Sequence, residues 1–208
     1  MIHSLSLDPR NCVGEGSGRM VFAHPDNRDA LVKIFKPRKN TGKSFRSLRP
    51  VRLRFGLFKA AYKEYEEYIA ALARLGHLPT CIPAFWGFVE TNLGIGMVVE
   101  RIDDADGNVA PNLFNYIQNH GLSNDLLTQT NVLVDELVEA GIASSDFRAR
   151  NIVVGVGEGG SIRLILVDGI AENTLIKIKS YCQPVLRMWM AKKHRRLIEE
   201  LRKIAEHE

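Results

Sequence analysis

Hydrophobic residues along this chain recur with two periods, and the change between them divides the sequence into strand-like and helix-like segments. Short runs rich in Val, Ile and Phe, bounded by Gly, Pro, Asn and Asp, are typical of antiparallel strands. A glycine-rich turn with strand-forming flanks covers residues 13–23, and the expected strands after it cover residues 30–35, 82–90, 96–102, 152–154 and 164–167.

Four other segments show apolar residues every three or four positions, which is the spacing of an amphipathic helix. The expected helices cover residues 59–75, 111–120 and 123–140, together with a basic helix that begins near residue 188. Gly76 and Gly141 follow two of them, and glycine commonly ends a helix. Strands early and helices late predict an α+β fold, and we place the boundary between its two parts, residues 1–102 and 103–208, at the polar turn 103–108.

Composition narrows the class of protein. Hydrophobic residues make up 45% and charged residues 25% of the 208, which is ordinary for a soluble globular protein. The three cysteines are odd in number and form no Cys-x-x-Cys pair, so we expect a reduced, cytoplasmic protein without a disulfide framework or a zinc site. No signal peptide and no apolar run of about 20 residues is apparent, so no membrane span is expected.

Positive charge is concentrated in the first half of the chain. Residues 1–99 carry 15 Lys/Arg against 8 Asp/Glu, and residues 36–59 hold nine Lys/Arg and no acid. The basic segment 36–59 is either a solvated connector or a docking surface for an acidic protein or a phosphate-rich partner. Phe45, Phe55 and Phe58 could stack on bases, but no nucleic-acid-binding motif accompanies them, so nucleic acid is not the expected partner.

Two polar residues in the second half of the chain are the first candidates for a functional site. Asp146 and Asn151 have the Asp-x-x-x-x-Asn spacing of a phosphoryl-transfer catalytic loop. A strand follows at once, and Asp168 comes seventeen residues after Asn151. This order of acid, amide, strand and second acid predicts a catalytic loop beside a magnesium ligand, because carboxylate and amide oxygens suit that hard ion.

The first half offers a matching place for phosphate groups. Gly14, Gly16 and Gly18 form a glycine-rich turn ahead of Val21, and glycines let backbone N–H groups approach a phosphate closely. Lys33 lies in the next expected strand and brings a positive charge.

In this order the features resemble the protein-kinase-like superfamily over most of the chain. The sequence is similar, more narrowly, to the bacterial family called PhoP regulatory network protein YrbL, through Trp86–Gly96, Arg150–Val154, Val167–Ile176 and the cationic Lys192–Arg196. The resemblance implies a minimal two-lobed kinase-like fold, with an antiparallel sheet and one helix in the N-lobe (1–102) and a short, mainly helical C-lobe (103–208).

The resemblance also implies ATP and Mg²⁺ as cofactors. Asp146, Lys33 and Arg148 would be catalytic: Asp146 orients or accepts the proton of the attacking hydroxyl, and Lys33 holds the α- and β-phosphates. Arg148 stands where protein kinases acting on Ser/Thr usually carry a lysine, and it would contact the γ-phosphate. Asn151 and Asp168 would ligate the magnesium ion. The implied nucleotide-binding residues are Gly14, Gly16, Ser17, Gly18, Val21, Lys33, Glu64, Glu100 and Ile102.

The partner of Lys33, the contacts to adenine and the role of Ser17 need further description. Glu64 is the expected ion-pair partner of Lys33, and Glu67 is the alternative. Glu100 and Ile102 would offer backbone groups to the adenine. Ser17 is either an autophosphorylation site or a small residue that suits the turn.

The sequence also departs from the kinase pattern. Arg19 replaces the third glycine, Ser144 and Ser145 replace the usual His-Arg, and Gly169–Ile170 follows Asp168 in place of Phe-Gly. We therefore keep three hypotheses: a phosphotransferase that acts on a hydroxyl of a protein (including itself) or a small molecule, an ATP-binding pseudokinase that serves as a regulator or scaffold, and a basic adaptor for RNA or an acidic protein.

Overall fold

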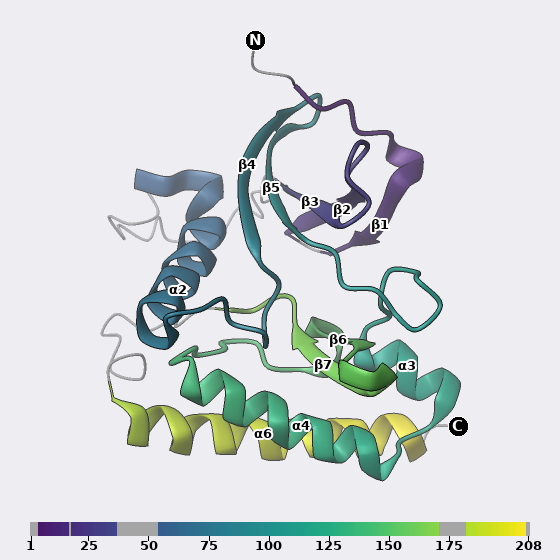
Figure 1. The fold of residues 1–208 in the computed structure, drawn as a ribbon, viewed down its shortest axis with the longest axis vertical. Coiled ribbons are helices and arrows are strands. Elements are labelled where there is room, and N and C mark those ends of the chain that lie inside the picture. The colour runs from purple at the N-terminus through teal and green to yellow at the C-terminus, as the bar shows by residue number, and fades with distance from the viewer. Residues whose placement is uncertain (1–3, 17, 37–53, 171–181, 207–208) are drawn as a thin grey trace, which may run out of the picture. The chain divides into compact units, whose positions relative to one another are not determined.

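The computed structural model describes residues 4–16, 18–36, 54–170 and 182–206, which divide into two compact units (Figure 1). The α+β class is confirmed, with an antiparallel sheet early in the chain and helices late. Unit 1 consists of residues 1–65 and 85–101, and unit 2 of residues 66–84 and 102–208. Ser17 and most of the basic segment, residues 37–53, lie outside the described residues.

Unit 1 is built on a five-stranded antiparallel sheet. Its strands are β1 (Cys12–Glu15), β2 (Arg19–Ala23), β3 (Ala30–Phe35), β4 (Phe85–Thr91) and β5 (Gly94–Glu100). They lie in the order β1-β2-β3-β5-β4, so β3 is central. The expected strand 82–90 begins three residues later than predicted, after Pro83, which has no N–H to donate to a sheet ladder.

Alternation along β3 divides the core of unit 1 into two layers. Val32 and Ile34 lie on one face, in a buried cluster with Leu7 and Phe22. Phe35 faces the other way and packs with a second cluster that includes Met97 and Val99. Lys33 lies on the same face as Phe35, because side chains two residues apart in a strand point the same way.

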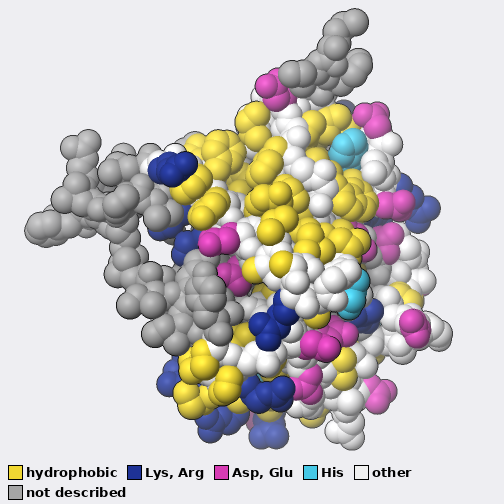
Figure 2. Space-filling model, turned by 60° about the vertical axis from the view of Figure 1, so that its left-hand side comes forward, with side chains coloured by type: hydrophobic (Ala, Val, Ile, Leu, Met, Phe, Trp, Pro, Cys, Tyr) yellow, Lys and Arg dark blue, Asp and Glu magenta, His cyan; other side chains and the backbone are white. Residues whose placement is uncertain are grey.

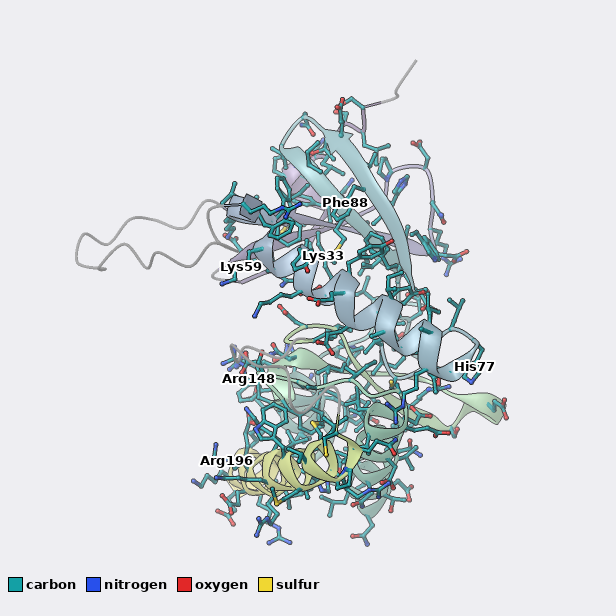
Figure 3. All side chains as sticks on the ribbon, turned by 90° about the vertical axis from the view of Figure 1, so that its left-hand side faces the viewer. Lys33, Lys59, His77, Phe88, Arg148 and Arg196 are labelled. Atoms are coloured by element: carbon teal, nitrogen blue, oxygen red, sulfur yellow. The ribbon has the colours of Figure 1, made fainter. Side chains whose placement is uncertain are left out.

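The second face of the sheet carries the first part of helix α2, up to Tyr65 in unit 1, and a row of aromatic rings. Helix α2 covers Lys59–Leu75, the range that the helical spacing predicted. The Tyr65 and Phe85 ring centroids lie 4.9 Å apart, and those of Phe85 and Phe88 lie 5.4 Å apart. Phe88, which is labelled in Figure 3, is 52% exposed, so the end of this row lies at the surface. Figure 2 shows hydrophobic side chains gathered at the surface of the protein.

In unit 2, two helices pack against a two-stranded hairpin, and a third helix packs against those two helices. The elements are α3 (Leu113–His120), α4 (Asn124–Glu139), β6 (Ile152–Val156), β7 (Ile162–Leu166) and α6 (Gln183–Glu206). Helix α6 runs alongside α4 (Figure 1), and Leu133, Leu137, Leu186 and Met190 on the two helices are almost completely buried. Among the described residues, no helix has the length and apolar composition that crossing a bilayer requires.

Local sequence explains where the helices begin and end. The Ser123 hydroxyl accepts a hydrogen bond from the Leu126 N–H at 3.2 Å, as expected for a residue that caps α4. Helix α6 begins at Gln183, five residues before its predicted start. Pro184 obscured this start in the sequence, but proline is tolerated in the first turn, where its missing N–H has no helical partner.

We predict that Gly96→Ala destabilises unit 1. A Cβ atom at Gly96 would lie 2.5 Å from Val32 Cγ1 and 3.0 Å from Ile34 Cδ1, inside the first core layer. The crowding should lower the free energy of unfolding by about 1–3 kcal/mol, measured by urea denaturation. Gly18→Ala is the control, because its Cβ would meet no atom within 4 Å. Equal unfolding midpoints for the two variants would contradict the close packing of β3 and β5.

A second prediction concerns pH and the packing of α4 against α6. Burial lowers the pKa of His194 below its ordinary 6.5, and the nearby Asp135 opposes this only in part. The Thr130 hydroxyl donates to the Leu127 carbonyl at 2.7 Å, so its oxygen is left to accept from His194 Nε2 at 2.8 Å.

Because the folded protein holds His194 neutral, the unfolded chain binds more protons just below pH 6.5. The contribution of this histidine to stability is therefore complete above about pH 6.5 and is lost as the pH falls toward the lowered, folded-state pKa. Urea denaturation at several pH values should show this loss in the wild type and a weaker one in His194→Gln, whose amide can still donate to Thr130. Parallel curves for the two proteins would refute the prediction.

Candidate functional site

The glycine-rich turn of unit 1 is the closed end of a β-hairpin. Strand β1 ends at Glu15, and the Gly16 N–H donates to the Arg19 carbonyl at 2.9 Å. The Lys36 N–H donates to the Gly18 carbonyl at 2.9 Å, and the Lys36 ammonium contacts the Gly16 carbonyl and the Glu15 carboxylate. The turn is thus tied to the chain just after β3 and is held next to the central strand.

Lys33 projects from the centre of the sheet toward helix α2. Its backbone is paired with Val21 on β2 and with Met97 on β5, and the residue is 6% exposed. Figure 3 labels Lys33 beside α2. The ammonium nitrogen lies 4.0 Å from Glu64 Oε2 on α2. The structure therefore brings together Val21, Lys33 and Glu64, three of the predicted nucleotide-binding residues, and Gly14 pairs with Val21 on the next strand.

A second cation shares the carboxylate of Glu64. The Arg19 guanidinium donates to Glu64 Oε1 at 2.6 Å, and its Cζ lies 5.5 Å from the centroid of the Phe35 ring. The sequence identified Arg19 only as a departure from the glycine pattern and did not predict this contact. The sequence did contain one signal for the position of Arg19, the two-residue period of the strand, which puts Arg19 on the same face as Val21. In the structure Arg19 is paired with Phe35 on β3.

The catalytic-loop residues of unit 2 form a hydrogen-bonded turn. The Asn151 amide donates to the Asp146 backbone carbonyl at 2.8 Å and to its carboxylate Oδ2 at 2.9 Å. Arg148 forms an ion pair with the same Oδ2 at 2.9 Å. A short 3₁₀ helix, η3 (Ala149–Asn151), closes the turn and leads directly into β6. Two predicted residues, Arg148 and Asn151, are therefore in direct contact with a third, Asp146.

Gly169 joins the second acid to this loop. It has φ +77°, and a Cβ placed there would lie 2.9 Å from the Cβ and the carbonyl oxygen of Asp146. The Gly169 N–H donates to Asp168 Oδ1 at 2.5 Å, and its carbonyl accepts from the Ser144 hydroxyl at 3.1 Å. Gly169 thus lies close to Asp146, and Asp168 is the residue directly before it. Ser144, a departure from the kinase pattern, makes one of the hydrogen bonds that fasten the two segments.

The donor atoms here suit a hard cation that is also bound by a phosphate. Because the Asn151 amide nitrogen faces Asp146, its side-chain oxygen is available as a ligand, and the Asp168 carboxylate supplies further oxygens. Magnesium commonly takes one or two protein oxygens and completes its octahedron with water and substrate phosphates. The described residues contain no group of three or more His, Cys, Asp or Glu that could hold a metal by themselves. The residues fit magnesium carried by a nucleotide.

Helix α6 supports both ends of the catalytic loop, which the sequence did not predict. The Lys193 ammonium donates to the Ser145 carbonyl at 2.8 Å, and the Ala149 N–H donates to Glu200 Oε2 at 3.4 Å. Leu197, which is 1% exposed, lies between these two residues on the same face of the helix. The sequence offered one signal for this support: Lys193 and Glu200 lie one helical turn before and one turn after Leu197, so the three share a face of the helix.

Glu100 and Ile102 are the two residues predicted to contact adenine. Glu100 is the last residue of β5 in unit 1, where it pairs with Ala30. Ile102 belongs to unit 2, and its carbonyl accepts a hydrogen bond from the Ala110 N–H at 2.9 Å. Their contact with adenine remains a prediction, as do the nucleotide contacts of the glycines.

Comparison with known proteins agrees with this geometry. The family model described as PhoP regulatory network protein YrbL matches residues 5–202. The uncharacterized protein YrbL of Escherichia coli (strain K12) is 24% identical over 180 residues, which cover 85% of this chain and 78% of that protein. The protein of the same name from Shigella flexneri matches with the same values.

A solved structure shows the same fold. The crystal structure of Rad53 1-466 in complex with AMP-PNP, a protein kinase, aligns with a TM-score of 0.53 and 18% sequence identity. The alignment covers 90% of this chain but only 45% of that one, so the present chain spans less than half its length. At this identity the likeness shows a kinase-like fold.

We predict that Glu64→Gln destabilises the protein. The side chains of Arg19, Lys33 and Glu64 are 14%, 8% and 10% exposed, and removal of the negative charge would leave two largely buried cations without it. The free energy of unfolding should fall by about 3 kcal/mol in urea denaturation. Glu90→Gln, at an exposed position on β4, is the control and should change it by less than about 0.5 kcal/mol. Equal stability of the two variants would show that the cluster contributes nothing.

Proposed function

We propose that this chain, which belongs to the PhoP regulatory network protein YrbL family, is an ATP- and Mg²⁺-dependent phosphotransferase that transfers the γ-phosphate to a hydroxyl group. The observation that carries the proposal is the network of unit 2, in which Asn151 is hydrogen-bonded to Asp146 and Gly169, the residue after Asp168, approaches both of them closely. The related fold of a kinase solved with AMP-PNP supports a nucleotide as the ligand.

In the proposed mechanism unit 1 binds the phosphates of the nucleotide. The glycine-rich turn offers backbone N–H groups, and Lys33 neutralises charge on the α- and β-phosphates. Glu64 directs the Lys33 ammonium by its position 4.0 Å away. Arg19 holds the other carboxylate oxygen at 2.6 Å and so keeps Glu64 from turning away.

Unit 2 would supply the groups for transfer. Asp146 orients the acceptor hydroxyl and receives its proton, while Arg148 exchanges its ion pair with Asp146 for the γ-phosphate. Asn151 and Asp168 would hold Mg²⁺, which neutralises charge on the phosphates when it is bound. The acceptor is a hydroxyl of a protein or a small molecule. The three free cysteines agree with a reducing compartment such as the cytoplasm.

One observation favours a second candidate, an ATP-binding pseudokinase. Asp146 Oδ2 already has two partners, Asn151 at 2.9 Å and Arg148 at 2.9 Å, and one must leave before this oxygen can accept a proton. Glu64 also lies closer to Arg19 than to Lys33. A protein kept in this arrangement would bind nucleotide without transferring phosphate.

We predict that Asp146→Asn and Lys33→Ala both abolish labelling of protein by γ-labelled ATP with Mg²⁺. The wild type should transfer label to itself or to a component of a lysate, and loss of the proton acceptor should lower the rate by about 10²–10⁴. Filter-bound label, measured over time with protein alone and with lysate, gives the rate.

Matched controls separate loss of chemistry from loss of structure. Asp106→Asn, in an exposed turn, and Lys192→Ala, at an exposed position on α6, should keep wild-type labelling. Binding of a fluorescent ATP analogue is measured on every protein. Tight binding without any transfer by the wild type would establish the pseudokinase, and absence of nucleotide binding would overturn both candidates.

A further inference from the structure

A groove in unit 2 has a composition that the catalytic loop does not require. It has a volume of about 400 Å³ and is bordered by α3, η3 and α6. Phe114 and Ile204 form its apolar part, and the cations Arg150, Arg196 and Lys203 line it together with two glutamates. We infer that this α3–α6 groove binds an acidic peptide segment of the phosphate acceptor, an inference that rests on the proposed function.

The charges of the groove favour a negatively charged ligand. Arg196 and Lys203 are exposed on α6, and Arg196 extends from the helix at the surface (Figure 3). Within the described part of the chain, no carboxylate lies within ion-pair distance of Arg150, Arg196 or Lys203. Of the acids in the lining, Glu200 already accepts a hydrogen bond from the Ala149 N–H. The lining therefore carries three positive and two negative charges, and one of the two carboxylates, that of Glu200, is directed toward the Ala149 N–H.

Arg150 is prepared to hold a carboxylate in a defined direction. Its guanidinium carbon lies 3.8 Å from the centroid of the Phe114 ring, and this stacking orients the planar group. A flat, oriented guanidinium presents two parallel N–H donors to a carboxylate, which gives direction as well as charge. Phe114 and Ile204 can at the same time contact the methylene groups of a Glu side chain or a neighbouring apolar residue.

The mixed sign of the lining favours a peptide over a polyanion. Glu199 lies in the groove with Arg196 and Lys203, and it would repel the continuous phosphates of a nucleic acid. A peptide can satisfy Glu199 with a backbone N–H while its acidic side chains meet the cations. A lining that contains both cations and glutamates thus favours an acidic peptide segment, which also has backbone hydrogen-bond donors.

The groove is connected to the proposed chemistry through the chain itself. Arg150 precedes the proposed magnesium ligand Asn151 and follows Asp146 by four residues. Four residues span at most about 14 Å, so the two positions are within reach of one short extended peptide. We therefore expect an acidic residue within about four positions of the hydroxyl that receives the phosphate.

Fluorescence anisotropy with labelled peptides tests this assignment. The probes are a short peptide with Glu and Asp around one Ser, the same peptide with Gln and Asn, and the same peptide with Lys. The wild type should bind the acidic peptide most tightly, with an affinity that falls as salt increases. Arg196→Glu/Lys203→Glu should weaken that binding by about tenfold or more and strengthen binding of the Lys peptide.

The matched control reverses the same number of charges on the same helix. Arg195→Glu/Arg202→Glu has the same spacing, but both residues lie outside the groove lining and are exposed. It should bind the acidic peptide within about twofold of the wild type. Thermal melts by circular dichroism establish that both double variants are folded. Equal weakening by the two pairs, or equal wild-type affinity for the acidic and neutral peptides, would overturn the assignment.

Two further arms separate this inference from the proposed function. Transfer of label from γ-labelled ATP to the acidic peptide is measured on the wild type and both double variants. Acidic binding that depends on Arg196 and Lys203, without any transfer, supports the groove and contradicts the phosphotransferase. Transfer to the acidic peptide that survives their reversal contradicts the groove alone. Displacement of the peptide by a short RNA at equal concentration would assign the groove to nucleic acid and overturn the inference.

Discussion

A buried lysine in the middle of a sheet needs a negative charge, and unit 1 is arranged around that requirement. Lys33 lies on the central strand β3 between Val21 and Met97 and is 6% exposed. A charge in such surroundings is costly unless it is paired and hydrogen-bonded. The carboxylate of Glu64 meets the need, and because it comes from α2, the same ion pair defines how the first part of that helix is turned toward the sheet.

In unit 2, hydrogen bonds to the backbone position the polar loop in a comparable way. Lys193 and Glu200 on α6 bind the Ser145 carbonyl and the Ala149 N–H, so the loop is held at both ends. Ser144 binds the Gly169 carbonyl. These contacts hold the Asp146 and Asn151 side chains together and keep Gly169, the residue after Asp168, close to both. Preorganisation of this kind is what phosphoryl transfer requires from a protein.

The sequence predicted regular elements well and, through the family resemblance, the pair of Lys33 and Glu64, but it missed the other long-range polar contacts. Helix α2 was predicted at its observed bounds because its apolar period is uninterrupted from Ala61 to Leu75, and the class of fold followed from the order of strands and helices. The start of α6 was missed because Pro184 looks like a break in a single sequence. Arg19 was missed because its partner Glu64 is 45 residues away, and no local pattern reveals which distant carboxylate a cation will meet.

Helix α6 carries two sets of polar residues that face different surroundings. Lys193 and Glu200 lie beside the buried Leu197 and support the loop, whereas Arg196 and Lys203 are exposed to solvent. Residues on the exposed side can be exchanged without loss of the contacts that Lys193 and Glu200 make with the loop. Under the proposed function, members of a family built on this helix could therefore diverge in their targets through a few surface positions, provided that Glu200, which lines the groove and also holds the loop, is kept.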